Sequence, residues 1–254
     1  MAIDKEQIRE MMADPRYPFA AKYDPDWIIG NEMGSHCLWL MEGLCREMRL
    51  KPGMRILDMG CGKAISSIFL AREFGAQVWA TDLWIPAAEN WDRIKEAGLT
   101  DRIFPIHADA RALPFADEFF DAAVSINTFQ FFGTDDTYLR NNFVKYIKPG
   151  GQIGIVVPGI FREFEDGVPD YLKKHWNPEF FNWHSPHWWR RHWERTGLVH
   201  VETADTFPER EGFRIFKVWE LIMDRCQGDN GGLIHTDDGR NITFVRMIAR
   251  RNGG

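Results

Sequence analysis

An apolar strand, a glycine turn and a helix follow one another directly over residues 54–74, and this succession leaves few folds open to the chain. The strand reads MRILDM, the turn reads GCG, and the helix is expected over 63–74. Further strands are expected at QVWATDL, RIFPIHAD, FFDAAVSINT and QIGIVVP, with helices over 85–98 and 137–147. Five strands joined by helical crossovers indicate a parallel, doubly wound α/β sheet.

The second half of the chain continues with elements of both kinds. An irregular aromatic stretch precedes a helix that Ser185 is expected to cap, with a proline as the first helical residue. A strand at VHVETADTF, a helix over 211–226 and a last strand at NITFVRMIARR follow. Upstream, Ser35 is expected to cap a helix that runs to about Met48. A chain of 254 residues fits one large domain.

The acidic residue before the glycine turn argues against the phosphates that such turns commonly bind. A glycine turn at a helix start attracts anions through its amide N–H groups and the helix dipole. Asp58 precedes Gly60 closely, where a carboxylate would repel a pyrophosphate. The dinucleotide pattern G-x-G-x-x-G fails because Ile65 replaces its third glycine, and the P-loop pattern fails in the spacing around Lys63. The turn is therefore expected to hold a ligand that is not an anion.

Two more carboxylates stand at the ends of the next expected strands. In an open parallel sheet, ligands lie outside the carboxyl ends of the strands. Asp82, at the end of the second strand, can accept hydrogen bonds from ribose hydroxyls, and Asp109, at the end of the third, can accept one from an adenine amine. Together with Asp58 they describe a nucleoside that carries positive charge and no phosphate.

Four segments together resemble the class I S-adenosylmethionine-dependent methyltransferases, within the small-molecule and quinone-biosynthesis-like branch. DMGCGKA is similar to their first motif, TDLW to their ribose-binding motif, HADARALPFADEFFDAAVS to their adenine motif and fourth strand, and KYIKPGGQIGIVVPG to the entry of the fifth strand. The resemblance is close over 35–158 and departs at Ala64, where a third glycine is common. It implies a Rossmann-like, doubly wound sheet of seven mostly parallel strands, the last antiparallel, with helices on both faces.

The resemblance also implies S-adenosyl-L-methionine as the cofactor and assigns roles to individual residues. The glycine loop would pass beneath the methionyl part, with Asp58 near its ammonium group. Asp82 would bind the ribose hydroxyls, and Asp109 the adenine amine. The cofactor-binding residues expected from the resemblance are Asp58, Gly60, Cys61, Gly62, Asp82, Leu83, Trp84, Asp109, Ala110 and Asn127.

The stretch after the fourth expected strand indicates the class of methyl acceptor. Nucleic-acid and protein amine methyltransferases with this core often carry N/D-P-P-Y/F there, whereas this chain reads NTFQFFGTDD. The formal net charge of −6 also leaves no broad basic surface for nucleic-acid phosphates. A small, partly apolar acceptor is therefore expected, with N, O, S and C all open as the accepting atom.

Aromatic residues are expected to line the acceptor pocket. The single domain over 1–254 would comprise an N-terminal arm over 1–34 and, by the resemblance, an aromatic lid over 159–195. The expected substrate-binding residues are Tyr23, Phe129, Phe131, Trp183 and Trp188. His184 lies in the lid and is the candidate catalytic residue, as a general base. The lid histidines have no Cys, Asp or Glu partners in a recognisable ligand set, so no metal is expected.

Three alternatives to this function stay open. A cyclopropane-forming lipid enzyme shares the same core, although neither a lipid groove nor a bicarbonate site has a clear signature here. A protein that binds S-adenosylmethionine without catalysis would consume no methyl groups. A nicotinamide oxidoreductase would need the missing third glycine and would not tolerate Asp58.

The start of the chain and its cysteines bear on the cellular compartment. Residues 1–10 are charged, so no signal peptide is expected, and no window approaches the roughly 18 apolar residues that span a bilayer. The four cysteines, Cys37, Cys45, Cys61 and Cys226, include no CxxC pair. A reduced, cytoplasmic protein with buried thiols is therefore expected. The aromatic lid could also seat a second subunit of a homodimer.

Overall fold

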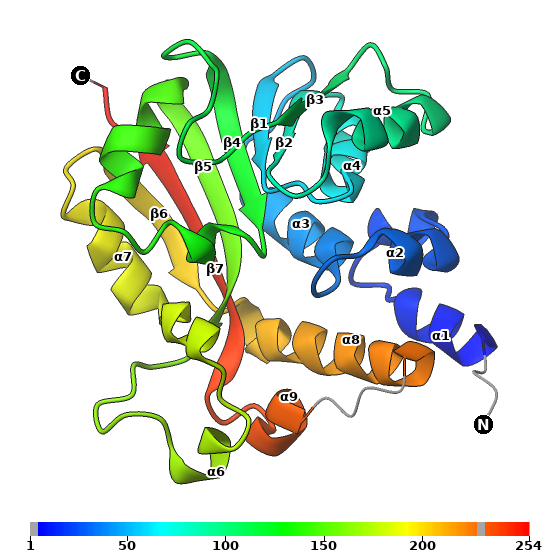
Figure 1. The fold of residues 1–254 in the computed structure, drawn as a ribbon, viewed down its shortest axis with the longest axis vertical. Helices are drawn as coiled ribbons and strands as arrows, with labels where there is room; N and C mark the ends of the chain where they lie inside the picture. The colour runs from blue at the N-terminus through cyan, green and yellow to red at the C-terminus, as the bar shows by residue number, and fades with distance from the viewer. Residues whose placement is uncertain (1–4, 228–231, 254) are drawn as a thin grey trace.

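The computed structural model describes residues 5–227 and 232–253 (Figure 1). At its centre is a seven-stranded sheet in the order β3-β2-β1-β4-β5-β7-β6. Strands β1 to β5 pair in parallel, whereas β7 is antiparallel to both of its neighbours. The predicted doubly wound sheet with an antiparallel last strand is therefore confirmed. The strands are β1 Arg55–Met59, β2 Gln77–Asp82, β3 Ile103–His107, β4 Phe120–Ile126, β5 Ile147–Ile160, β6 Val199–Asp205 and β7 Ile242–Arg251.

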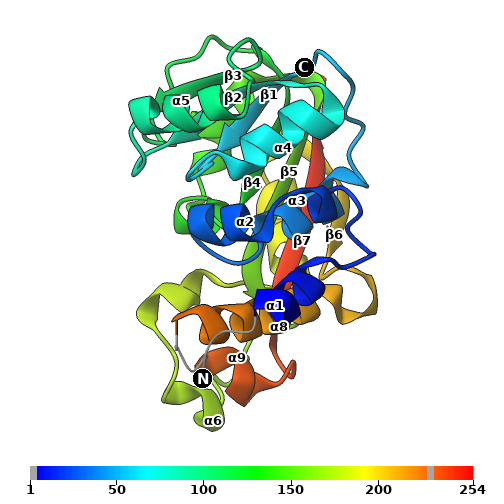
Figure 2. The same cartoon turned by 90° about the vertical axis from the view of Figure 1, so that its right-hand side faces the viewer.

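Helices cover both faces of this sheet (Figures 1 and 2). Consecutive residues of a strand point to opposite faces. Ile56 of β1 accordingly packs with the apolar residues of α3, α4 and α8, whereas Leu57 packs with those of α7 and of residues 129–146. The helices are α1 Lys5–Met12, α2 Pro25–Asn31, α3 Cys37–Cys45, α4 Ile65–Phe74, α5 Ala87–Glu96, α6 Asp170–Lys173, α7 Pro186–Glu194, α8 Glu211–Gln227 and α9 Gly232–Asp237.

Two helix starts test the predicted caps. At α7, Ser185 Oγ accepts a hydrogen bond from the amide N–H of Trp188, and the next residue is a proline, as predicted. At α3 the prediction is wrong by one residue, because the N-cap is His36 instead of Ser35, and the His36 Nδ1 accepts the amide N–H of Trp39. Burial lowers the pKa of His36 to about 3, so the neutral imidazole keeps the lone pair that this bond requires.

The predicted helix over 137–147 forms two short turns instead. Leu139–Phe143 is a π-helical turn and Val144–Tyr146 is a 3-10 turn. Two buried tyrosines anchor the segment, because Tyr138 Oη donates to the Ala110 carbonyl at 3.0 Å and Tyr146 Oη donates to the Leu113 carbonyl at 2.8 Å. These bonds hold the connection between β3 and β4 against the sheet.

The described part of the N-terminal arm packs against α3 and α8. The hydroxyl of Tyr17 donates a hydrogen bond to Glu211 at the start of α8, and its ring stacks on Trp39 of α3 with 5.4 Å between centroids. Figure 1 shows α8 beyond the end of the sheet toward which β4 points. The arm and α8 therefore lie together at the edge where the parallel strands end.

Two further sequence predictions concern thiols and membrane spans. Cys37, Cys45 and Cys61 are buried free thiols, while the side chain of Cys226 lies outside the described residues. Within the described ranges, no helix is both long and apolar enough to cross a bilayer.

Candidate active site

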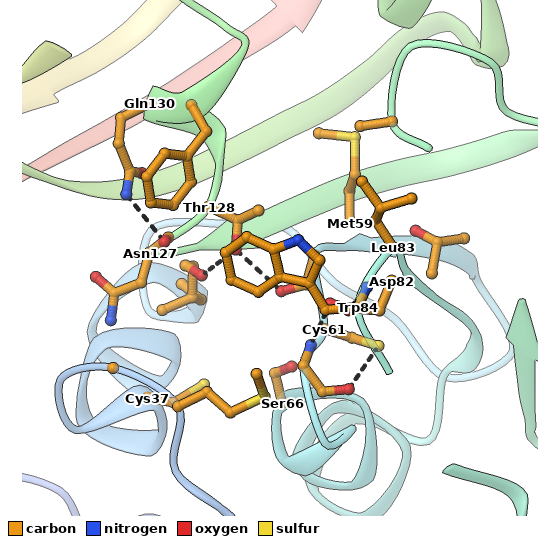
Figure 3. A pocket seen from close by; sticks show the side chains of 18 of the residues that line it. Cys37, Met59, Cys61, Ser66, Asp82, Leu83, Trp84, Asn127, Thr128 and Gln130 are labelled. Atoms are coloured by element: carbon orange, nitrogen blue, oxygen red, sulfur yellow. Dashed lines mark hydrogen bonds between the residues drawn. The ribbon is translucent and has the colours of Figure 1, made fainter. Parts of the chain in front are cut away.

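A cavity of about 500 Å³ opens at the edge of the sheet where β1, β2 and β4 end. The strand order reverses between β1 and β4, and ligands of open α/β sheets bind at such a switch point. Figure 3 shows Asn127, Thr128 and Gln130 on one side of the cavity and Asp82 and Leu83 on the other. The volume lies in the range of roughly 300–1,000 Å³ found for small-molecule sites. This cavity is therefore the candidate active site.

The glycine loop between β1 and α4 lines the cavity with its amide groups already engaged. Gly60 and Cys61 donate their N–H groups to the Thr81 carbonyl at 2.8 and 3.0 Å. Gly62 donates its N–H to Asp82 Oδ2 at 2.8 Å. None of these three donors is left for a phosphate, which fits the expectation that the loop holds a ligand that is not an anion.

Space and backbone conformation explain the small residues of this loop. Gly60 has a φ of 72°, and a Cβ there would lie 2.2 Å from Thr128 Cγ2. Ala64 also has a positive φ, 61°, and it is the fully buried N-cap of α4. An alanine in this conformation costs roughly 1–2 kcal/mol, so the loop keeps its shape at that cost without the third glycine.

Asp82 connects the glycine loop to the turn after β2. Its Oδ1 accepts the amide N–H groups of Trp84 and Ile85 at 2.8 and 2.9 Å, in addition to the bond from Gly62 to Oδ2. A carboxylate oxygen can accept two hydrogen bonds, so Oδ2 keeps a lone pair for a ligand. Leu83 and Trp84, which follow Asp82, also line the cavity.

The connection after β3 supplies the next part of the wall. Asp109 and Ala110 both line the cavity. Asp109 forms an ion pair with Arg111 at 2.6 Å, and the hydrogen bonds from Arg111 lower the pKa of the Asp109 carboxyl. Asp109 is therefore a fixed anion at this wall.

Asn127 follows β4 and carries an unused hydrogen-bond acceptor. Its φ is 57°, unusual for a residue other than glycine. Its Nδ2 donates to the Ser35 carbonyl at 3.3 Å, and its main-chain carbonyl accepts a bond from Gln130 at 3.0 Å. In the described part of the chain, its Oδ1 is buried and has no partner. Buried polar atoms are nearly always paired, so this oxygen has the capacity for one more hydrogen bond.

Asp58 is not among the residues that line the cavity, so its expected place near the ammonium group of the ligand stays a prediction. The side chain is buried, and its Oδ2 accepts hydrogen bonds from Ser66 and Ser67 of α4, both at 2.6 Å. Burial raises the pKa of Asp58 to about 6, although the two serines oppose this effect. Asp58 therefore holds the first turn of α4 to β1.

The aromatic residues predicted to bind the acceptor divide into two groups. Phe131 and Trp183 line the cavity. Phe129 is fully buried beside Trp189 and Trp193, in the core between the sheet and α7. Phe129 therefore has no surface to offer an acceptor, although it neighbours Phe131 closely in sequence.

Tyr23 and Trp188 also lie away from the cavity. Tyr23 is buried against Phe69 of α4, and its hydroxyl donates to Glu73 at 3.3 Å. Trp188 stacks between His184 and His192, with 3.7 and 4.5 Å between ring centroids. Both side chains complete the packing of helices, which corrects the prediction that they contact the acceptor.

The candidate base His184 is not among the residues that line the cavity. Its ring stacks on Trp188, and its Nδ1 is 3.1 Å from Glu163 Oε2. Glu163 also accepts the amide N–H of Ser185 at 2.6 Å. His184 thus belongs to the packing at the start of α7, and its role as a base stays a prediction.

No sequence pattern indicated the part of the cavity wall that the N-terminal arm provides. Asn31, Glu32, Met33 and Gly34, between α2 and α3, line the cavity. They contain no motif, and only their proximity to the expected helix start could have indicated them. The apolar wall is completed by Phe180 and by Phe216 of α8. Among the described residues, no cluster of three or more His, Cys, Asp or Glu could hold a metal ion.

Residues 56–151 match the model of a family described as a methyltransferase domain. Methyltransferase GfsG of Streptomyces halstedii is 32% identical over 155 residues, which cover 59% of this chain and 53% of that protein. The ubiquinone/menaquinone biosynthesis C-methyltransferase UbiE of Vibrio parahaemolyticus is 29% identical over 179 residues, 68% of this chain and 64% of that protein. The chain thus spans less than two thirds of the length of these relatives.

A solved structure with the same fold covers almost the whole chain. It is geranyl diphosphate C-methyltransferase from Streptomyces coelicolor A3(2) in complex with Mg²⁺, geranyl diphosphate and S-adenosyl-L-homocysteine. The TM-score is 0.67 and the identity 17%, over 98% of this chain and 87% of that one.

Proposed function

We infer that this chain, whose residues 56–151 match a methyltransferase-domain model, is a class I S-adenosylmethionine-dependent methyltransferase that transfers a methyl group from S-adenosyl-L-methionine to a small molecule in the cavity. One observation carries the inference. The glycine loop at the switch point has its N–H groups engaged, while Asp82 and Asp109 line the cavity with carboxylate acceptors. Such a site suits a nucleoside with a cationic tail.

The residues present fit this cofactor group by group. The free lone pair of Asp82 is available to a ribose hydroxyl, and Asp109 to an adenine amine, with Leu83 and Trp84 beside the adenosine. Asn127 and the glycine loop face the methionyl part. When bound, the cofactor supplies a methyl group on a positively charged sulfur, which a nucleophile can displace in line.

The chain itself contributes position and the exclusion of water. Phe131, Phe180, Trp183 and Phe216 form an apolar wall on which a partly apolar acceptor can lie. Holding two reactants in line is worth about 7–11 kcal/mol of the barrier in well-oriented systems. With His184 outside the cavity, we assign the rate enhancement to this alignment. Residues 159–195 would then act as the lid that Phe180 and Trp183 bring to the cavity.

Two similar proteins support an acceptor with an apolar part. One is the ubiquinone/menaquinone biosynthesis C-methyltransferase UbiE, and the other is geranyl diphosphate C-methyltransferase. Both names describe carbon methylation, which favours carbon as the accepting atom here.

The proposal is tested by following S-adenosylhomocysteine by mass spectrometry while the purified protein is incubated with S-adenosylmethionine and single acceptors. Demethylated quinols and isoprenoid diphosphates are the first acceptors to try. Product that forms only when an acceptor is present supports methyl transfer. Tight cofactor binding without product from quinols, isoprenoids, amines, phenols or thiols would favour the non-catalytic alternative.

A further inference from the structure

One carboxylate in the cavity has no role so far. Glu32 lies on the turn between α2 and α3 and lines the cavity. Its Oε2 accepts the amide N–H of Cys37 at 2.9 Å, and its Oε1 that of Met33 at 3.3 Å. The positive charge of Lys63 acts to lower the pKa of the Glu32 carboxyl, and the Lys63 Nζ itself donates a hydrogen bond to the Gly30 carbonyl at 3.0 Å.

The neighbours of Glu32 place it at one particular end of the cavity. A Cβ on Gly62 would lie 3.0 Å from the sulfur of Met33, and one on Gly34 would lie 3.1 Å from Asn127 Nδ2. The arm therefore bridges the end of the glycine loop and the end of β4. Figure 3 shows Asn127 and Cys37 on one side of the cavity, with Asp82 and Leu83 opposite.

The amide N–H groups of Met33, Gly34 and Cys37 and the charge of Lys63 only partly offset the burial of the Glu32 carboxylate. Burial raises the pKa of the Glu32 carboxyl to about 7. A buried carboxylate regains its ionised form when a cation comes within hydrogen-bond distance. Asp58 does not line the cavity, and its Oδ2 is already bonded to Ser66 and Ser67.

We propose that Glu32 receives the ammonium group of the methyl donor. An ammonium has three N–H donors and no acceptor, and the carboxylate of Glu32, which lines the cavity, offers acceptors to it from the arm. Glu32 then takes the role expected from the sequence for Asp58. This inference rests on the proposed function, because it concerns how the same cofactor is held.

The test is a calorimetric titration with two ligands that differ only at this end. S-adenosylhomocysteine carries the ammonium group, whereas 5′-methylthioadenosine lacks the whole amino-acid part. In Glu32→Gln, affinity for S-adenosylhomocysteine should fall about tenfold or more, and affinity for methylthioadenosine should change by less than about twofold. Glu47→Gln is the matched control, since Glu47 is exposed and is not among the residues that line the cavity. It should leave both affinities unchanged.

The outcomes separate this inference from the proposed function. Equal losses for both ligands in Glu32→Gln, or no loss for either, would overturn the role of Glu32 and leave the cofactor assignment intact. Failure of the unmodified protein to bind either ligand would instead remove the proposed function.

A pH series on the unmodified protein keeps the test decisive even if Glu32→Gln does not fold. Protonation of Glu32 removes its charge, so affinity for S-adenosylhomocysteine should rise from pH 6 to pH 8, while affinity for methylthioadenosine stays flat. The groups around Glu32 are Lys63, the Cys37 thiol, whose pKa burial raises, and Asp58 behind them, whose pKa is about 6. A rise shared equally by both ligands would assign the effect to Asp58 and refute the proposal.

Discussion

At Gly60, the addition of a single carbon atom decides whether the glycine loop between β1 and α4 can form. A Cβ at this position would enter the side chain of Thr128, and the φ of 72° adds strain for any other residue. We predict that Gly60→Ala lowers the free energy of unfolding by about 2–4 kcal/mol. Urea denaturation measures this loss.

Gly98 supplies the matched control for that experiment. Its φ is 69°, but no atom lies within 4 Å of a Cβ placed there. Gly98→Ala should therefore cost only the roughly 1–2 kcal/mol of the left-handed conformation. Equal losses in the two variants would show that the contact with Thr128 does not determine the loop.

The buried Asp58 carboxyl makes the free energy of unfolding depend on pH. Its folded-state pKa, about 6, lies above the ordinary value of 3.8, so the folded protein binds more protons than the unfolded chain between pH 4 and pH 6. The contribution of Asp58 to stability is therefore present at low pH and falls as the pH rises. Relative to Asp58→Asn, the unmodified protein should lose roughly 3 kcal/mol of unfolding free energy between pH 4 and pH 7. A difference that is constant or grows with pH would contradict the burial of this charge.

At the scale of elements, two tryptophans near the start of α7 have different surroundings. Trp183 lines the cavity, whereas Trp188 stacks with histidines outside it. If the proposed function holds, Trp183→Ala should lower kcat/KM for the acceptor roughly tenfold or more, because it removes part of the acceptor wall. Trp188→Ala should lower the melting temperature and leave KM for the acceptor nearly unchanged, and His184→Ala should keep its turnover across pH. Steady-state kinetics on the three variants decide this, and a large loss of turnover in His184→Ala alone would restore it as a base.

The elements also show what the sequence could and could not predict. Strand-end positions follow from alternation and parallel topology, so Asp82, Asp109 and Asn127 could be placed at one edge in advance. The direction of the Asp58 side chain could not be predicted, because it depends on hydrogen bonds from Ser66 and Ser67, which lie on the next helix.

The acceptor wall was harder to predict for a related reason. Phe129 and Phe131 are separated by one residue, and a 3-10 turn sends the first into the core and the second toward the cavity. Periodicity does not reveal such a turn. Glu32 escaped prediction because Gly62 and Asn127, which contact the adjoining Met33 and Gly34, are far from it in sequence and no motif marks the arm.

At the scale of the whole molecule, the cavity is closed by segments from both ends of the chain. Trp219 of α8 donates its Nε1–H to the Gly34 carbonyl at 2.7 Å, and Arg16 of the arm pairs with Glu211 at 3.2 Å. Phe216 of the same helix lines the cavity. The central sheet is thus completed by an arm and a helix that shape one wall of the cavity.

The most direct test of the account is a calorimetric titration of the purified protein with S-adenosylhomocysteine, repeated on Asp82→Asn. The exposed Asp101→Asn serves as control, and melting temperatures confirm that each variant is folded. We predict one binding site per chain, an affinity reduced about tenfold or more in Asp82→Asn, and no change in Asp101→Asn. Absence of binding to the folded, unmodified protein at millimolar ligand would contradict the cofactor assignment and the function drawn from it.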